Sequence, residues 1–173
     1  MSAFLFVDQL RGRKNIVDEE NGRKLGEIGL LEDVVTQVGV LQRSKSAMHS
    51  MVRIVKNAGS ALAPGVNAIF DTDLYGTHVD GSPADDVAAD GVVDPSLTSN
   101  VETGETFLLF VEGPCPVIVS AAVAGPYVVP SGSGKFKTAV VAAAGRCGRT
   151  LEDGTGKSDT ETMRVYLQCH SNF

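Results

Sequence analysis

Histidine and cysteine are the residues of this sequence that are best able to bind a metal or to act as a base or nucleophile. The three histidines lie far apart, at His49, His78 and His170, and none belongs to an HxH, HExxH or HxxxH pattern. A small metal-dependent hydrolase would have to gather distant ligands, and its candidate set is His49, His78, Cys169 and His170. We interpret the adjacent pair Cys169 and His170 as the end of a strand, because neighbouring strand side chains point to opposite faces.

The cysteines do not indicate a disulfide or zinc framework. Cys115, Cys147 and Cys169 are an odd number and contain no CxxC pair. A free cysteine behaves as a small apolar residue, so we expect reduced thiols in the protein core. Reduced thiols favour assembly inside a cell.

Two glycine-rich segments are faintly similar to a phosphate-binding loop. Gly-Ser-Gly-Lys at 132–135 and Gly-Thr-Gly-Lys at 154–157 lack the GxxxxGK[ST] spacing between a strand and a helix that a Walker loop needs. We interpret both as hairpin tips. The acidic run at 80–86 lacks the alternating acids and the final glutamate of an EF-hand. The sequence therefore predicts a protein that is not an enzyme and has no cofactor or metal site.

Charge is distributed unevenly along the chain, whose net charge is −6. The segment from Asn57 to Gly134 contains ten acidic residues and no lysine or arginine, while the other residues carry 15 basic and 11 acidic side chains. Such a dipolar subunit can pair head to tail with copies of itself; alternatively, the acids lie on solvated loops and supply solubility.

Neither nucleic acid nor a membrane is expected as a partner. Phosphate binding needs a concentrated basic face, and the densest basic group here is Arg11, Arg13 and Lys14. No stretch approaches the 18 consecutive apolar residues of a membrane-spanning helix.

Short apolar runs separated by Gly, Pro, Asp and Ser dominate the chain after His49. We expect strands at 51–55, 66–70, 91–93, 106–111, 116–121, 127–129, 137–143 and 163–169. Short strands joined by turns are typical of an antiparallel sandwich or barrel. The predicted fold class is therefore mainly β, with a compact antiparallel β-barrel or sandwich at 51–173.

Residues 1–50 are expected to form an N-terminal arm with a short helix. Residues 1–25 have little periodicity, which is typical of an arm that is mobile or laid across a partner. From Ile28 to Leu41 the apolar residues follow helical spacing, which predicts a short helix, although their β-branched side chains favour a strand.

The segments MVRIVKNAGSALAPG (51–65), DDVAADGVVDPSLTSNVETGETFLLFVEGPCPVIVSAA (85–122), GRCGRTLE (145–152) and MRVYLQCH (163–170) form a characteristic order of Gly, Pro and apolar positions. In this order the chain resembles the decoration, or cement, proteins of tailed-bacteriophage capsids. The resemblance contains no catalytic signature. It implies a compact β-barrel on the capsid exterior of a virion assembled in the host cytoplasm. It also implies a homotrimer that binds the major capsid protein and cements capsomers together.

The family uses extended arms to clamp capsomers, and the arm of this chain carries aromatic and arginine residues. Because these residue types concentrate interface energy, we predict capsid or subunit contacts at Phe4, Phe6, Arg11, Arg13 and Lys14. The alternative is that the arm tip packs on its own barrel. A tail-tube or head-joining protein is the competing structural class, and the metal-dependent hydrolase is the competing enzyme class.

Overall fold

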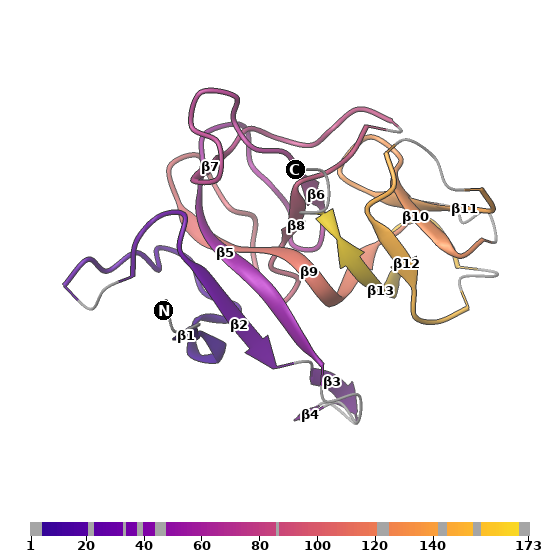
Figure 1. Ribbon diagram of the computed structural model, residues 1–173, viewed down its shortest axis with the longest axis horizontal. Helices are drawn as coiled ribbons and strands as arrows, with labels where there is room; N and C mark the ends of the chain where they lie inside the picture. Colours follow the sequence, from indigo (N-terminus) through magenta and orange to yellow (C-terminus); the bar gives the residue numbers. More distant parts are fainter. Residues whose placement is uncertain are drawn as a thin grey trace.

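The computed structural model describes residues 5–20, 23–32, 34–37, 40–43, 48–85, 87–120, 125–141, 145–153 and 157–169. These residues form a mainly β protein, shown in Figure 1. The strands are β1 (Leu5–Phe6), β2 (Ile28–Glu32), β3 (Val34–Gln37), β4 (Val40–Arg43), β5 (His49–Asn57), β6 (Asn67–Ala68), β7 (His78–Val79), β8 (Gly91–Val93), β9 (Thr106–Ile118), β10 (Tyr127–Pro130), β11 (Phe136–Ala139), β12 (Gly148–Thr150) and β13 (Thr162–Gln168). A short 3-10 helix, η1, spans Asp8–Leu10. Within the described ranges, no helix has the length and apolar character needed to cross a membrane.

The strands form one large sheet and one small hairpin. The large sheet has 11 strands and the order β1-β2-β5-β9-β13-β12-β10-β11, with β6, β7 and β8 attached to its middle. Most of its pairs are antiparallel, and β1-β2 and β5-β7 are parallel. The prediction of a mainly β, antiparallel fold is confirmed. The path from β1 to β11 is open at both ends, so the sheet is not a closed barrel.

Strand β9 is the centre of the fold because both of its faces are buried. Its run of apolar residues does not alternate with polar ones: Leu108 and Phe110 belong to one core cluster, while Phe107, Leu109 and Val111 belong to the other. A strand covered on both faces needs such a continuous apolar run. The apolar run at 106–111 therefore predicted a strand correctly, and both faces of that strand are covered by other parts of the chain.

Two layers cover the two faces of β5 and β9. The first cluster contains side chains of β10, β11 and β13 and that of Cys147, together with Val7, Leu10 and Ile16 from the start of the chain. The second contains side chains from residues 62–101, which run over the opposite face. Val7, Leu10 and Ile16 are thus part of the core of this chain. The tip that precedes Val7 has no described side chains, so the two alternatives for the arm tip remain predictions.

Strand β9 bends at Gly113, where it leaves β5 and continues along β13. Glu112 is the last residue paired with β5, and the partners of β13 run from Glu112 to Ile118. Gly113 has a φ of +93°, and a Cβ atom there would lie 2.5 Å from the carbonyl oxygen of His49. Glycine is the residue that fits such a close approach at positive φ.

The prolines after this bend explain why two strands were predicted where one exists. Pro114 and Pro116 cannot donate to a ladder, so the sequence favoured separate strands at 106–111 and 116–121. The carbonyl oxygen of Pro114 accepts a hydrogen bond from Ser50 Oγ at 2.6 Å. Alternate residues direct their backbone groups to the same side of a strand, so both missing N–H groups face away from β13.

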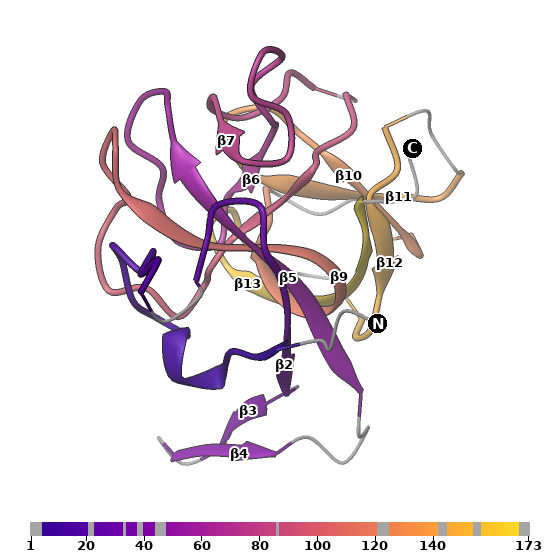
Figure 2. The same cartoon turned by 60° about the vertical axis from the view of Figure 1, so that its left-hand side comes forward.

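The predicted helix between Ile28 and Leu41 is wrong. These residues form β2, β3 and the start of β4, and β2 pairs with β5 from Ile28↔Arg53 to Glu32↔His49. In β2 the burial alternates, with Gly29 and Leu31 buried. The β-branched side chains of β3 and β4 favour strands, and the pairing of β2 with β5 overrides the helical spacing. Figure 2 shows β3 and β4 as a hairpin that stands off from the large sheet.

Candidate protein-docking site

The residues predicted to contact other subunits lie near the start of the chain, and three of them are on a loop that follows η1. Phe4 lies outside the described residues. Phe6 is in β1, where it pairs with Leu30, and its side chain lies outside the described part of the chain. Arg11, Arg13 and Lys14 occupy the loop at residues 11–18, which we call the arginine loop.

Asp94 anchors the arginine loop from 82 residues further along the chain. Its Oδ2 accepts a hydrogen bond from the Gly12 N–H at 2.6 Å, and its Oδ1 accepts one from the Ser96 N–H at 2.8 Å. The side chain is completely buried, and this burial raises the pKa of Asp94 although both N–H groups favour its charged form. The carboxylate therefore joins the loop to the sheet at a buried point.

A second anchor joins the loop to the start of β9. The Asn15 N–H donates to the carbonyl oxygen of Thr106 at 2.7 Å. The Lys14 ammonium lies 2.8 Å from the carboxylate of Glu105 and donates to the Asn100 carbonyl oxygen at 2.8 Å. The hydrogen bond from Lys14 is the main reason that the pKa of Glu105 is lowered. Lys14 thus links the arginine loop to Glu105 and Asn100 of the same chain, and its charge is already paired.

Arg11 is also committed to contacts within the chain. Its guanidinium donates to the carbonyl oxygen of Glu32 at 2.5 Å and lies 3.8 Å from the carboxylate of Asp8. Arg13, in contrast, is exposed and has no hydrogen bond or ion pair with any described residue. Of the three basic residues predicted as contacts, Arg11, Arg13 and Lys14, Arg13 is the one whose charge is not paired with a described residue and is left for a partner.

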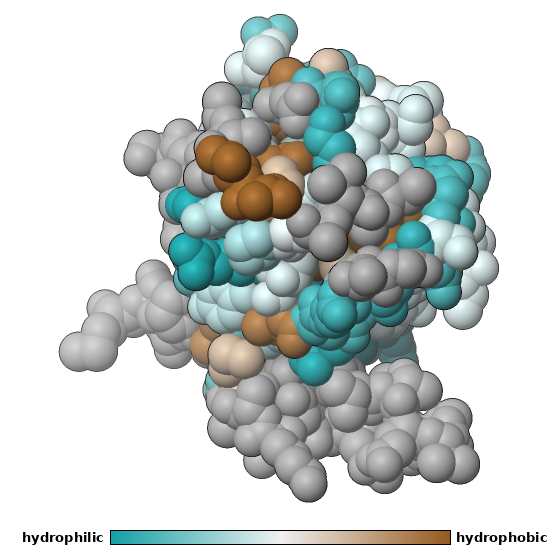
Figure 3. Space-filling view, turned by 90° about the vertical axis from the view of Figure 1, so that its right-hand side faces the viewer, coloured by the Kyte–Doolittle hydropathy of each residue, from teal (hydrophilic) through white to brown (hydrophobic). Residues whose placement is uncertain are grey.

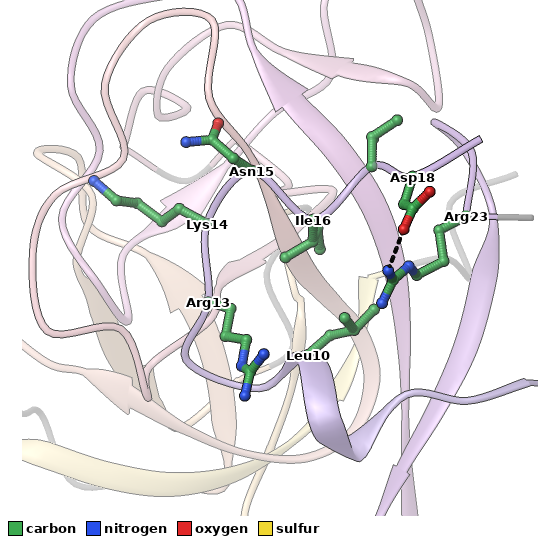
Figure 4. A pocket seen from close by; sticks show the side chains of 8 residues that line it. Leu10, Arg13, Lys14, Asn15, Ile16, Asp18 and Arg23 are labelled. Atoms are coloured by element: carbon green, nitrogen blue, oxygen red, sulfur yellow. Dashed lines mark hydrogen bonds and ion pairs between the residues drawn. The ribbon is translucent and has the colours of Figure 1, made fainter. Parts of the chain in front are cut away.

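A depression lies beside Arg13. Its volume is about 290 Å³, and it is lined by Leu10, Arg13, Lys14, Asn15, Ile16, Val17, Asp18 and Arg23. Figure 4 shows the Leu10 and Ile16 side chains between Arg13 and the Asp18–Arg23 ion pair, whose oxygen and nitrogen are 2.8 Å apart. This volume lies just below the range of about 300–1,000 Å³ that is usual for small-molecule sites. The depression is suited to one or two inserted side chains.

A second surface with docking character is the turn at residues 71–77. Leu74 and Tyr75 are 47% and 51% exposed, and such exposed large apolar side chains are typical of interaction surfaces when they cluster. The Tyr75 ring packs edge-on against Phe70, with ring centroids 4.8 Å apart. Phe70 in turn lies 5.6 Å from the Arg53 guanidinium. The Tyr75 ring is therefore half exposed, and its position is fixed by packing against Phe70.

Exposed apolar residues also follow β11. Val140 and Val141 are 64% and 75% exposed. The face shown in Figure 3 carries apolar patches separated by hydrophilic surface.

We expect the Asp90 carboxylate to control the ionisation of Tyr75. Burial, followed by the charge of Asp90 3.5 Å from the phenol oxygen, raises the pKa of Tyr75. The substitution Asp90→Asn should therefore lower that pKa. Absorbance titration of the phenolate band, with Tyr75→Phe subtracted to isolate this tyrosine, measures the shift. An identical titration curve before and after the substitution would show that the two groups do not interact.

Those candidate metal ligands that the structure describes are not brought together. His49 begins β5 and His78 pairs with Lys56 near the end of the same strand, so about 23 Å separates them at 3.3 Å per residue. Cys169 is buried in the first core cluster, and His170 lies outside the described residues. Among the residues that the structure describes, no group of three or more His, Cys, Asp or Glu is placed to hold a metal ion.

Taken together, the fold and the site define a mainly β protein that presents an anchored, exposed arginine and supported apolar side chains. No protein-family model matches the chain, and no curated protein matches it. A crystal structure of the N base of the head fibre gp8.5 of bacteriophage phi29 is similar, with a TM-score of 0.51 and 11% sequence identity. The similarity covers 68% of this chain and 93% of that one, and at this identity it shows a shared fold.

Proposed function

We propose that the chain is a structural protein of a bacteriophage virion and that it is carried on the head. The observation that carries the proposal is the fold shared with the base of a phage head fibre, which extends over 93% of that chain. The order of Gly, Pro and apolar positions in this sequence, which resembles capsid decoration proteins, supports the same assignment independently.

The role that fits best is that of a cement protein on the capsid exterior. In this role the chain forms a homotrimer, binds the major capsid protein and performs no catalysis. The N-terminal tip with Phe4 and Phe6 contacts the shell in this proposal, because aromatic residues concentrate interface energy and β1, which contains Phe6, is the first strand at one end of the sheet. Many equivalent copies allow weak individual contacts to add up to stable binding.

The structure determines how short the test variant must be. Deleting residues 1–25 would remove Val7, Leu10 and Ile16 from the core together with the anchors of the arginine loop. Such a variant would lose both its fold and its binding, so the loss of binding could not be assigned to the tip. Substitution of the tip itself avoids this problem.

We expect the double substitution Phe4→Ser and Phe6→Ser to weaken binding to purified heads that lack this chain by at least about tenfold. The reason is that an aromatic side chain buried in an interface typically contributes more than about 1 kcal/mol to the binding free energy. Co-sedimentation measures the bound fraction. The matched control is Phe4→Leu with Phe6→Leu, which keeps the apolar surface and should bind nearly as well as the unsubstituted chain. Binding of the unsubstituted chain to purified tails and not to heads would instead favour the tail-tube or head-joining class.

A further inference from the structure

The turn at residues 71–77 holds Tyr75 and Leu74 outward on a fixed backbone. The Asp71 Oδ1 accepts hydrogen bonds from the Asp73 N–H at 2.8 Å and from the Leu74 N–H at 3.1 Å. At the other end of the turn, Thr77 Oγ1 donates to the Leu74 carbonyl oxygen at 2.8 Å. An aromatic side chain on such a turn loses little conformational entropy when it binds, because its position is already fixed.

The same turn carries an available negative charge. The Asp73 carboxylate is exposed and has no hydrogen bond or ion pair with any described residue. The turn therefore presents an apolar, aromatic tip with a free carboxylate next to it.

The depression beside Arg13 has the complementary features. Its accessible surface is mostly polar, with Leu10 and Ile16 almost wholly buried at its base and Val17 partly buried, and the guanidinium of Arg13 is part of its lining. Tyr75 does not line the depression of its own chain. Each chain thus carries both the exposed Tyr75 turn and the Arg13 depression, and the turn does not fill the depression of the same chain.

We propose that the Tyr75 turn of one copy docks into the Arg13 depression of a second copy, with Asp73 paired to Arg13 across the interface. The inference deepens the self-association proposed above by naming the two surfaces that meet. Complementary charge indicates the occupant. The turn belongs to the segment without lysine or arginine, whereas the depression is lined by Lys14 and Arg23, which are paired with Glu105 and Asp18, and by Arg13, whose charge is left for a partner. Tyrosine and arginine are also the residue types that most often dominate interface energies.

Charge reversal tests the contact in the full chain. We expect Arg13→Glu and Asp73→Lys each to raise the dissociation constant for self-association by about tenfold or more, because each places like charges opposite one another. The double variant Arg13→Glu/Asp73→Lys restores an opposite pair with its direction reversed, so its self-association should return close to that of the unsubstituted chain. Sedimentation velocity over a concentration series provides the constants.

Two matched controls carry the same charge changes elsewhere. Arg146→Glu alters an exposed arginine that packs on Tyr127, and Glu20→Lys alters an exposed acid outside the turn; both should self-associate like the unsubstituted chain. The inference is overturned if the single variants match these controls, or if the double variant is as weak as its two changes combined. A chain that stays monomeric at every concentration overturns the inference and the homotrimer together, whereas shell binding is decided separately by co-sedimentation.

Discussion

Replacing Asp94 by alanine should lower the free energy of unfolding by about 2–3 kcal/mol and release the arginine loop from the sheet. The substitution removes the acceptors of the Gly12 and Ser96 N–H groups, which are both partly buried. An unpaired donor costs about 1–3 kcal/mol when it is fully buried and less where water can reach it. Loss of a buried carboxylate, whose charge is disfavoured by burial, offsets part of this penalty. Urea unfolding measures the stability, and hydrogen exchange at the Gly12 amide measures the release.

The matched control for Asp94 is Asp85→Ala. Asp85 is exposed and pairs with Lys137 at 2.7 Å, and a surface pair of this kind contributes at most about 1 kcal/mol. We therefore expect only a small change in stability and no change in exchange at Gly12. Equal effects of the two substitutions would show that Asp94 does not anchor the loop.

The Asp94 effect should also depend on pH. Burial raises the folded-state pKa of Asp94 above its unfolded value, so the folded chain binds the proton more tightly. The stability from this group is fully present below the unfolded pKa and is lost as the pH rises through the folded pKa. The difference in unfolding free energy between the unsubstituted chain and Asp94→Ala should therefore grow as the pH falls from neutral toward the unfolded pKa.

The substitution Gly113→Ala should destabilise the fold by about 3–5 kcal/mol, which is a large part of the about 5–15 kcal/mol that stabilises a typical domain. The added Cβ would lie 2.5 Å from the His49 carbonyl oxygen and 2.9 Å from the Ser50 Cα. Both are backbone atoms of β5, so neither can move without disturbing the central strand pair. Thermal and urea unfolding measure the loss.

Gly104→Ala separates the two causes of this loss. Gly104 also has positive φ, at +89°, but a Cβ there would meet nothing within 4 Å. It should therefore cost only the backbone strain, about 1–2 kcal/mol. A loss for Gly113→Ala no larger than that for Gly104→Ala would contradict the close approach of β5 and β9 at the bend.

The sequence predicted the strands that carry the core better than those that extend the sheet. In the run at 106–111 every residue after Thr106 is apolar, so the run indicates a strand buried on both faces. Strands β1, β7 and β12 are two or three residues long, and they are defined by partners distant in the sequence. The helix prediction at 28–41 failed because pairing with β5 overrode local spacing.

The candidate site was only partly visible in the sequence. The cluster of basic residues identified Arg13, but it could not distinguish Arg13 from Arg11 and Lys14, whose partners are set by the fold. Asp94 and Glu105 are about 80–90 residues from the loop that they hold, so no local pattern connects them with it. A lone acid placed just after a buried strand is the signal that could have suggested Asp94.

The most direct measurement of the central claim is a cryo-electron microscopy reconstruction of the virion that contains this chain. The account predicts density for its sheet on the outer surface of the head, with the N-terminal tip toward the shell. Density for the chain inside the tail, or a particle whose head lacks it while the protein is free in solution, would contradict that claim.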